Sequence, residues 1–292
     1  MPDFDLHAPR SLREASQLLA EYAGEARPIA GGTALVLMIR QGLLRPRALV
    51  RLDRVPGLDS VQLDNGLLRL GAMVPLHTIV HSPLVRATIP LLAQTCNLVG
   101  NVRVRNAATI GGNLCEADYA SDPPTVLVAL DARVRVHGRA GERELAVAEL
   151  IQDFYETSLA PDELVSEVHV PVPASGMRGV YLKFVTRSAE DRPCVGVATL
   201  VRLDADGRVD ELRVAVGAVA GQPLRLPAVE REVRGSRLSA EVLEALAQQY
   251  AAAVEPVADA RGSAAYRRQM IAVFVRRALR AALAGTTGAW QV

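Results

Sequence analysis

Two pairs of adjacent glycines, Gly31-Gly32 and Gly111-Gly112, constrain the fold of this sequence more than any other feature. Because glycine has no Cβ, each pair lets the backbone turn tightly and lets its N–H groups approach a ligand closely. The first pair follows the short apolar segment Pro28-Ile29-Ala30 and precedes Thr33-Ala34-Leu35, which opens an apolar, helix-like run. Neither pair belongs to a G-x-G-x-x-G fingerprint or a G-x-x-x-x-G-K-[ST] loop, so the common nucleotide-binding folds are not indicated.

The second pair has similar neighbours: a hydroxyl, a β-branched residue and a carboxamide. The segment reads Thr109-Ile110-Gly111-Gly112-Asn113, and Asp122 follows nine residues after Asn113. Thr109 and Asn113 bracket the bare backbone with side-chain donors, which suits a phosphate or a pyrophosphate. Taken alone, the segment is also compatible with a strand followed by a turn with an asparagine cap. Two such turns in one chain predict a clasp around a single extended diphosphate.

Length and composition are those of a globular protein. With 292 residues, half of them apolar, the chain can bury a large core and is expected to form two domains. Its formal net charge is +1, with acids and bases interspersed, so we do not expect a nucleic-acid-binding surface. The N-terminus is acidic, and no apolar run reaches the ~18–20 residues of a membrane span. We therefore expect a cytoplasmic protein without a membrane span.

The cysteines and histidines predict no metal site in this chain. Cys96, Cys115 and Cys194 are far apart, and no C-x-x-C motif occurs, which disfavours a disulfide framework, a structural zinc site or an iron–sulfur cluster. His77 and His81 could share one helix face, but no third ligand lies nearby in the sequence, so solvated or capping histidines are the better interpretation. Any iron–sulfur cluster that serves this chain would belong to a partner.

The order of predicted elements changes along the chain. A helix after Ser11, a strand over 28–30, a helix over 34–40 and a strand over 48–52 predict a small α/β unit in roughly the first 57 residues. A hairpin over 60–70 with an Asn65-Gly66 turn follows. Beyond it we expect helices over 78–81 and 83–99, a helix that starts with Asp122 as its N-cap, and extended segments over 132–137, 154–159 and 164–170.

After Pro171-Val172-Pro173 the sequence predicts strands over 180–186, 195–203 and 209–219, and then helices at about 227–235, 239–253 and 262–284. Strands followed by helices indicate an α+β domain with helices on one face of an antiparallel sheet. Five arginines of the last helix form either a solvated face or a surface for a partner subunit: Arg267, Arg268, Arg276, Arg277 and Arg280.

The segments A-G-G-T-A-L and T-I-G-G-N-L-C-E-A-D-Y-A-S-D resemble the FAD-binding medium subunit of the molybdenum hydroxylases, a family that includes carbon monoxide dehydrogenase and xanthine dehydrogenase. Further matches in family order are Leu159 to Val165 (L-x-P-D-E-L-L), the stretch from Lys183 to Ala198, and Arg261 to Arg268 (R-A-S-x-x-Y-R-R). The resemblance implies a two-part FAD-binding domain of the vanillyl-alcohol-oxidase-like type over 1–173, with subdomains of about 1–57 and 58–173. An α+β C-terminal domain over 178–286 would follow.

The resemblance also implies which residues hold FAD. Backbone N–H groups of both glycine turns would wrap the diphosphate, and Asp122 would bind a hydroxyl of the sugar or the ribityl chain. Lys183 would lie near the polar edge of the flavin; the alternative is a strand lysine that is exposed at a domain boundary. The implied set is Ile29, Ala30, Gly31, Gly32, Thr33, Ala34, Leu35, Val99, Thr109, Ile110, Gly111, Gly112, Asn113, Asp122, Val165 and Lys183.

Two departures from the family pattern affect the site. Thr33 stands where the family often has histidine, so a non-covalent flavin is expected. Asp118-Tyr119 replaces the usual Ser-Pro, and Tyr119 is either an aromatic at the flavin or a surface residue.

The function implied by the resemblance is that of the FAD-binding subunit of a heteromeric molybdenum hydroxylase. It would pass electrons from 2Fe-2S clusters of a small partner, fed by a molybdopterin-containing large partner, to NAD, a quinone or oxygen. One alternative is a stand-alone flavin-dependent oxidoreductase with its own small-molecule substrate, although no convergent set of catalytic side chains is evident. Another is an assembly scaffold that has lost FAD, which the intact glycine turns disfavour.

Overall fold

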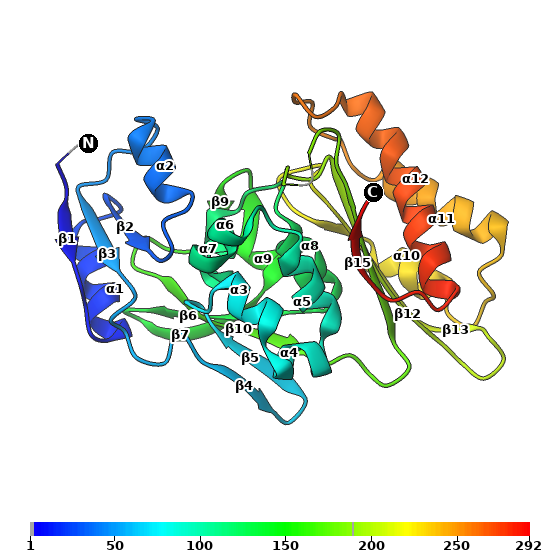
Figure 1. The fold of residues 1–292 in the computed structure, drawn as a ribbon, viewed down its shortest axis with the longest axis horizontal. Helices are drawn as coiled ribbons and strands as arrows, with labels where there is room; N and C mark the ends of the chain where they lie inside the picture. The colour runs from blue at the N-terminus through cyan, green and yellow to red at the C-terminus, as the bar shows by residue number, and fades with distance from the viewer. Residues whose placement is uncertain (1–2, 189) are drawn as a thin grey trace.

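The computed structural model describes residues 3–188 and 190–292, which form an N-terminal, a central and a C-terminal unit in chain order (Figure 1). The N-terminal unit is a parallel sheet of strand order β1-β3-β2 with two helices. Its elements are β1 (Asp5–His7), α1 (Leu12–Glu21), β2 (Ala26–Ile29), α2 (Leu35–Arg40) and β3 (Ala48–Arg51). The predicted helices and strands of this unit are confirmed; β1 was not predicted, because three residues are too few to show a period.

The central unit is an antiparallel sheet of order β4-β5-β10-β6-β7 with helices on one face. Asn65 and Gly66 both have positive φ and form the predicted turn between β4 and β5. The strands are β4 (Val61–Asp64), β5 (Leu67–Gly71), β6 (Arg133–Gly138), β7 (Gly141–Ala146) and β10 (Leu164–Pro171), with the small pair β8 (Ile151–Asp153) and β9 (Glu156–Thr157) beside them. The helices are α3 (Leu76–His81), α4 (Pro83–Thr88), α5 (Pro90–Asn97), α6 (Val102–Ala107), α7 (Ile110–Glu116), α8 (Asp122–Ala129) and α9 (Val147–Leu150).

Three local predictions for the central unit are wrong. The segment expected to be extended over 154–159 begins with a turn in which Tyr155 has φ +59°, and only Glu156–Thr157 forms a strand. The single helix expected over 83–99 is divided into α4 and α5, because Pro90 keeps Ile89 out of the helical conformation (ψ 66°). The helix expected to start with Asp122 as its cap has Ser121 at that position, and Asp122 is its first helical residue.

The C-terminal unit is a sheet of order β14-β13-β12-β11-β15. Its strands are β11 (Arg178–Phe184), β12 (Val195–Leu203), β13 (Val209–Gly217), β14 (Leu224–Arg225) and β15 (Gly288–Gln291), and its helices are α10 (Pro227–Glu232), α11 (Ala240–Ala252) and α12 (Ala264–Leu283). The sheet is antiparallel except for β15, which pairs with β11 in parallel and was not predicted. This α+β unit confirms the predicted fold class.

The central and C-terminal units share a buried apolar core. Helix α12 packs on β11 and β12, while α5 and α8 of the central unit contact the same C-terminal sheet. The core of the central unit accordingly includes Tyr181, Ala198 and Ala215 from the C-terminal sheet. This shared core fixes the two units against each other.

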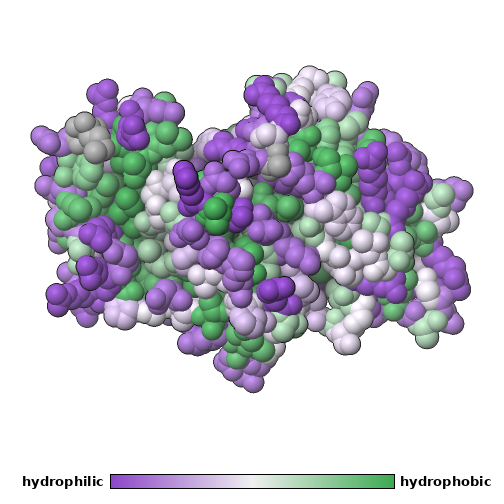
Figure 2. Space-filling model, viewed as in Figure 1, coloured by the Kyte–Doolittle hydropathy of each residue, from purple (hydrophilic) through white to green (hydrophobic). Residues whose placement is uncertain are grey.

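The molecular surface in Figure 2 mixes charged and apolar residues, with an apolar area over α2. The exposed apolar residues there are Val36, Leu37 and, just beyond the helix, Leu43. Within the described ranges, no helix is both long and apolar enough to cross a membrane.

Candidate functional site

The two glycine turns meet in the folded chain. A Cβ built on Gly31 would lie 1.7 Å from the carbonyl oxygen of Ala107, at the end of α6 and two residues before Thr109. A Cβ built on Gly112 would lie 3.6 Å from that of Ala30. The first contact leaves no room for any side chain at Gly31, so the approach of the two segments depends on glycine. The predicted meeting of the turns is confirmed.

The first turn presents a row of free backbone donors. None of the N–H groups from Gly31 to Leu35 donates a hydrogen bond within the described parts of the chain. Gly32 has φ +69°, which favours glycine. Gly31 and Thr33 are exposed, and their neighbours Ile29, Ala30, Ala34 and Leu35 are partly exposed. Successive unpaired N–H groups at a turn form a concave site for an anion.

The N–H groups of the second turn, by contrast, already have partners. Ile110 and Gly111 donate to the carbonyl oxygens of Val74 and Ala72, at 3.0 and 2.9 Å. The N–H of Gly112 donates to Oγ1 of Thr109 at 3.1 Å, an N-cap of helix α7. The segment is therefore a helix start, rather than a strand with a turn.

The carboxamide of Asn113 also has an internal partner. It exchanges hydrogen bonds with the hydroxyl of Ser121, at 2.8 and 3.1 Å, and the Asn113 N–H donates to the carbonyl of Thr109 at 2.9 Å. The first turn thus has the free N–H donors. The second turn packs against the first and, through Asn113 and Ser121, fixes the segment that leads to Asp122.

The segments that carry the two turns contain no carboxylate side chain. Asp and Glu are missing from 28–52 and from 65–115, and arginines occur in both stretches. An anion beside Gly31 therefore finds no acidic side chain on either neighbouring segment, which lowers the electrostatic cost of binding it. This compositional bias is visible in the sequence and supports the anion-binding interpretation of the turns.

Asp122 lies in a buried polar cluster formed by the central and C-terminal units. Its carboxylate accepts a hydrogen bond from the hydroxyl of Tyr181 at 2.7 Å and forms an ion pair with Nζ of Lys183 at 2.9 Å. Lys183 also donates to the carbonyl oxygen of Leu98 at 2.7 Å. Tyr181 and Lys183 are two residues apart on β11 and so point to the same side of the strand. Strand spacing is the signal by which Tyr181 could have been found from the sequence.

Burial governs the protonation of this cluster. It raises the pKa of Tyr181 well above its usual value, so the phenol keeps its proton and donates a hydrogen bond to Asp122. Burial also raises the pKa of Asp122, against the opposing effects of Lys183 and Tyr181. The interpretation of Lys183 as an exposed lysine is wrong, because the residue is only 1% exposed. Two of its three N–H donors have protein partners, which leaves one for a ligand.

Two further residues of the implied set lie near this cluster or in the core. Val99, partly exposed, follows Leu98 directly, and its carbonyl accepts a hydrogen bond from Arg105 at 3.0 Å. Val165 lies on β10 in the core of the central unit and is 3% exposed. Val99 thus directly follows Leu98, whose carbonyl oxygen binds Lys183. The side chain of Val165, by contrast, is largely enclosed by protein.

Tyr119 is partly exposed, and its hydroxyl has a partner in the C-terminal unit. Its hydroxyl donates to Oδ2 of Asp259 at 2.6 Å, which joins the central unit to the C-terminal unit. The interpretation of Arg267 as part of a solvated face or a partner surface is wrong, because Arg267 is fully buried. Arg277 and Arg280 of the same helix are exposed, as predicted.

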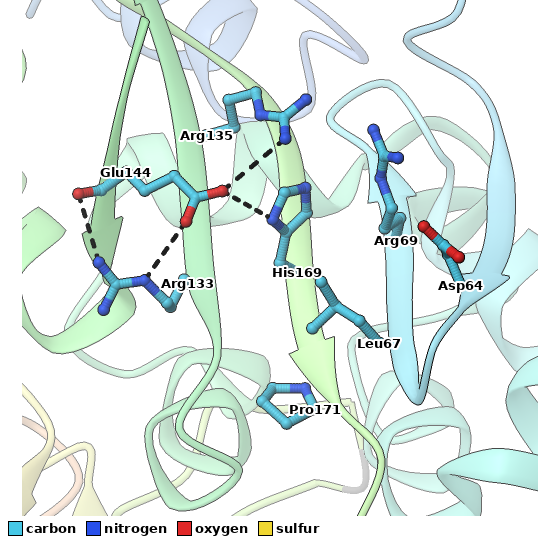
Figure 3. Close-up of a pocket in the computed structure, with 8 residues that line it drawn as sticks. All are labelled: Asp64, Leu67, Arg69, Arg133, Arg135, Glu144, His169 and Pro171. Atoms are coloured by element: carbon cyan, nitrogen blue, oxygen red, sulfur yellow. Dashed lines mark hydrogen bonds and ion pairs between the residues drawn. The ribbon is translucent and has the colours of Figure 1, made fainter.

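A separate charged cavity of about 230 Å³ lies on the open face of the central sheet (Figure 3). His169 lies there with Nδ1 3.1 Å from Glu144 and Nε2 2.7 Å from Glu167. Arg135 lies 3.2 Å from Glu167, and Arg133 lies 3.6 Å from Glu144. The charged side chains that line this cavity pair with one another and form an ion-pair network. None of the lining residues belongs to either glycine turn. Within the described ranges, no cluster of side chains suited to a metal ion occurs.

Comparisons with known proteins cover the same two parts of the chain. A model described as "FAD binding domain in molybdopterin dehydrogenase" matches residues 2–173, and one described as "CO dehydrogenase flavoprotein C-terminal domain" matches residues 180–282. The chain is 33% identical to the 6-hydroxypseudooxynicotine dehydrogenase complex subunit alpha of Paenarthrobacter nicotinovorans, over 97% of this chain and 95% of the relative. It is 32% identical to the carbon monoxide dehydrogenase medium chain of Hydrogenophaga pseudoflava, over 97% and 98%.

Solved structures of complete relatives share the fold. Carbon monoxide dehydrogenase from Hydrogenophaga pseudoflava superposes with a TM-score of 0.93 and 32% identity, over 98% of this chain and 99% of the other. Quinoline 2-oxidoreductase from Pseudomonas putida 86 superposes with a TM-score of 0.91 and 28% identity, over 97% and 98%. The glycine turns, the fold and these matches together show the family. The chain belongs to the FAD-binding medium subunits of the molybdenum hydroxylases, the oxidoreductase family of carbon monoxide dehydrogenase and xanthine dehydrogenase.

Proposed function

We propose that this chain passes electrons from iron–sulfur clusters of a small partner subunit to an external acceptor, through FAD held at the two glycine turns. Bound FAD supplies the redox chemistry, since it exchanges electrons both singly and in pairs. The observation that carries the proposal is the row of five free N–H groups from Gly31 to Leu35, packed against the second turn. This row fits the diphosphate of a dinucleotide, and its N–H groups donate no hydrogen bond to any of the residues that the structure describes.

The roles of the chain are to bind and to orient. The first turn would hold the diphosphate through its N–H groups, and the Thr109 cap, a rotatable hydroxyl, can release the N–H of Gly112 to the same anion. Asp122 and Lys183 would then meet the ribityl chain and the polar edge of the ring. Lys183 would offer its third N–H and its charge there, while Asp122 and the Leu98 carbonyl keep the ammonium in place.

The redox partners follow from what the sequence lacks. It has no C-x-x-C motif and only three cysteines, so the clusters would lie in a small iron–sulfur subunit and the molybdopterin in a large subunit. The relatives are named medium chains or subunits of complexes. The acceptor would be NAD, a quinone or oxygen.

The charge of Lys183 provides the test. In the variant Lys183→Met, we expect FAD to bind with its reduction potential shifted to more negative values, because the ring gains negative charge on reduction and loses a nearby cation. Spectroelectrochemical titration of the purified flavoprotein measures the potential. An unchanged potential would remove this role from Lys183.

The stand-alone alternative is tested with the same material. Lys183 is the only lysine in the sequence, so an amine reagent labels it as a single side chain that mass spectrometry can follow. We expect added FAD to slow this labelling, because bound flavin would cover Lys183. For the stand-alone alternative, the test is turnover: we expect the isolated chain to hold flavin without oxidising a substrate. Copurification with iron and molybdenum from the native host would support the complex, and substrate turnover by the isolated chain would support the alternative.

A further inference from the structure

Tyr119 connects the central unit to the C-terminal unit through one carboxylate. Its hydroxyl donates to Oδ2 of Asp259 at 2.6 Å and accepts a hydrogen bond from Nη1 of Arg261 at 3.1 Å. The Tyr119 ring also packs edge-on against Phe154, with centroids 5.0 Å apart. The side chain is therefore held at both its hydroxyl and its ring.

Asp259 is itself fixed to the C-terminal sheet. It pairs with Arg261 and with Arg267, each at 2.5 Å. Arg267 is fully buried and donates to the carbonyl oxygens of Cys194 and Ala218. Partial burial acts to raise the pKa of Asp259, but the hydrogen bonds from Tyr119, the Arg261 N–H and Arg267 outweigh it and lower the pKa to about 2. The carboxylate is thus charged, and it is anchored through Arg267 to the start of β12.

The same anchor reaches the strand that carries Lys183. The N–H of Cys194 donates to the carbonyl of Phe184 at 2.7 Å, and Lys183 faces Gly196 in the pairing of β11 with β12. Asp259 is therefore connected to the end of β11 by Arg267, Cys194 and Phe184.

The segment from Asp118 to Asp122 consequently meets the C-terminal unit at more than one point. Tyr119 binds Asp259, and three residues later Asp122 binds Tyr181 and Lys183. Asp118 adds an ion pair with Arg192 at 2.9 Å. The shared core already holds the two units together, and these three contacts fix the short segment itself against the C-terminal unit.

We propose that Tyr119 is a positioning residue: its bond to Asp259 holds the segment from Asp118 to Asp122 against the C-terminal unit, so that Asp122 and Lys183 stay paired and Lys183 is presented to the flavin in one orientation. The link to the flavin rests on the proposed function, while the link to Lys183 does not.

The reactivity of the single lysine tests this directly. In the variants Tyr119→Phe and Asp259→Asn, we expect the amine labelling rate of Lys183 to rise about tenfold in the full chain, because a hydrogen bond to a charged group no longer opposes local movement of the segment that carries Asp122 away from Lys183. Tyr22→Phe is the matched control, since it removes a 2.9 Å bond from a tyrosine hydroxyl to Asp5 at the other end of the molecule. Its labelling rate should equal that of the unmodified sequence.

The flavin gives a second readout. With FAD bound, Tyr119→Phe should shift the reduction potential in the same direction as Lys183→Met and by less. Equal labelling rates in Tyr119→Phe and the unmodified sequence would overturn the proposal, and so would an equal increase in Tyr22→Phe, which would indicate general loosening. Faster labelling in Tyr119→Phe without any protection by FAD would uphold the positioning role and reject the flavin-binding role of the site.

Discussion

At the residue scale, single atoms decide whether the candidate site can exist. Gly31 has the carbonyl of Ala107 where its own Cβ would be, and Gly111 has Ala72 at 2.5 Å from a built Cβ. Both neighbours belong to the backbone or to a short side chain, so neither can move away by rotation. Lys183 is the only lysine, and its ammonium is enclosed by Asp122 and Leu98. The two glycines are required for a steric reason, and Lys183 is held by its charge and its hydrogen bonds.

Substitution of Gly31 tests the packed turn. In Gly31→Ala, the methyl group would force α6 away from the first turn, so we expect FAD affinity to fall at least about tenfold and the protein to lose about 1–3 kcal/mol of stability. Flavin fluorescence and chemical denaturation measure the two effects. Gly179→Ala serves as the control, because its methyl group would meet only the flexible end of Leu91, at 3.0 Å. Full affinity in Gly31→Ala would mean that the turns are not packed as described.

At the element scale, α8 joins the units. It starts with Asp122 in the buried polar cluster, all of its residues are buried, and it packs on β12 and β13 of the C-terminal sheet. The helix and the sheet pack tightly at Gly217, where a built Cβ would lie 1.9 Å from Oγ1 of Thr125. The helix and the sheet therefore depend on a residue without a side chain at their crossing.

The contact between Gly217 and Thr125 can be tested with a destabilising substitution at one residue and a compensating substitution at the other. Gly217→Ala should destabilise the protein by about 1–3 kcal/mol, because the added methyl group overpacks the contact between α8 and β13. Thr125→Ala in the same chain removes Oγ1 and should restore much of the loss. Urea unfolding of the two single variants and the double variant measures the coupling. Additive effects would show that the two residues do not meet.

At the scale of the whole molecule, stability depends on charges gathered where the central and C-terminal units meet. Burial raises the pKa of Glu116 to about 7, with a further contribution from Asp118, although Arg192 opposes it. The folded chain thus holds a proton on Glu116 between pH 4.5 and 7, and the unfolded chain does not. The free energy of unfolding gained from this proton is present below about pH 4.5 and is lost as the pH rises to about 7.

Glu116→Gln isolates this contribution. The variant cannot titrate, so its free energy of unfolding should fall less between pH 4.5 and 7, by about 1–3 kcal/mol compared with the unmodified chain. Denaturation curves at a series of pH values provide the measurement. Parallel pH profiles for the two proteins would place the Glu116 carboxyl in water.

Much of the architecture could be predicted from local sequence signals. Ser11 at a helix start, the Asn65-Gly66 turn and the change from strands to helices at about residue 227 each act through neighbouring residues, and each is found in the structure. The division at Pro90 and the cap at Ser121 were missed. Ser and Asp are both residue types that favour the N-cap position, so the sequence alone does not decide whether Ser121 or Asp122 caps the helix. The structure decides it through Tyr181 and Lys183, about 60 residues away, which bind the Asp122 carboxylate.

The sequence by itself determined that two bare-backbone turns exist, that their flanking segments carry no acid, and that the cluster ligands for iron are missing. These are properties of composition and of neighbouring residues. Only the tertiary structure decided that the first turn has the free N–H groups, that Lys183 and Arg267 are buried, and that Tyr119 binds Asp259. The physical reason is that burial and hydrogen-bond partners are set by segments far apart in the chain, and folding alone brings those segments together.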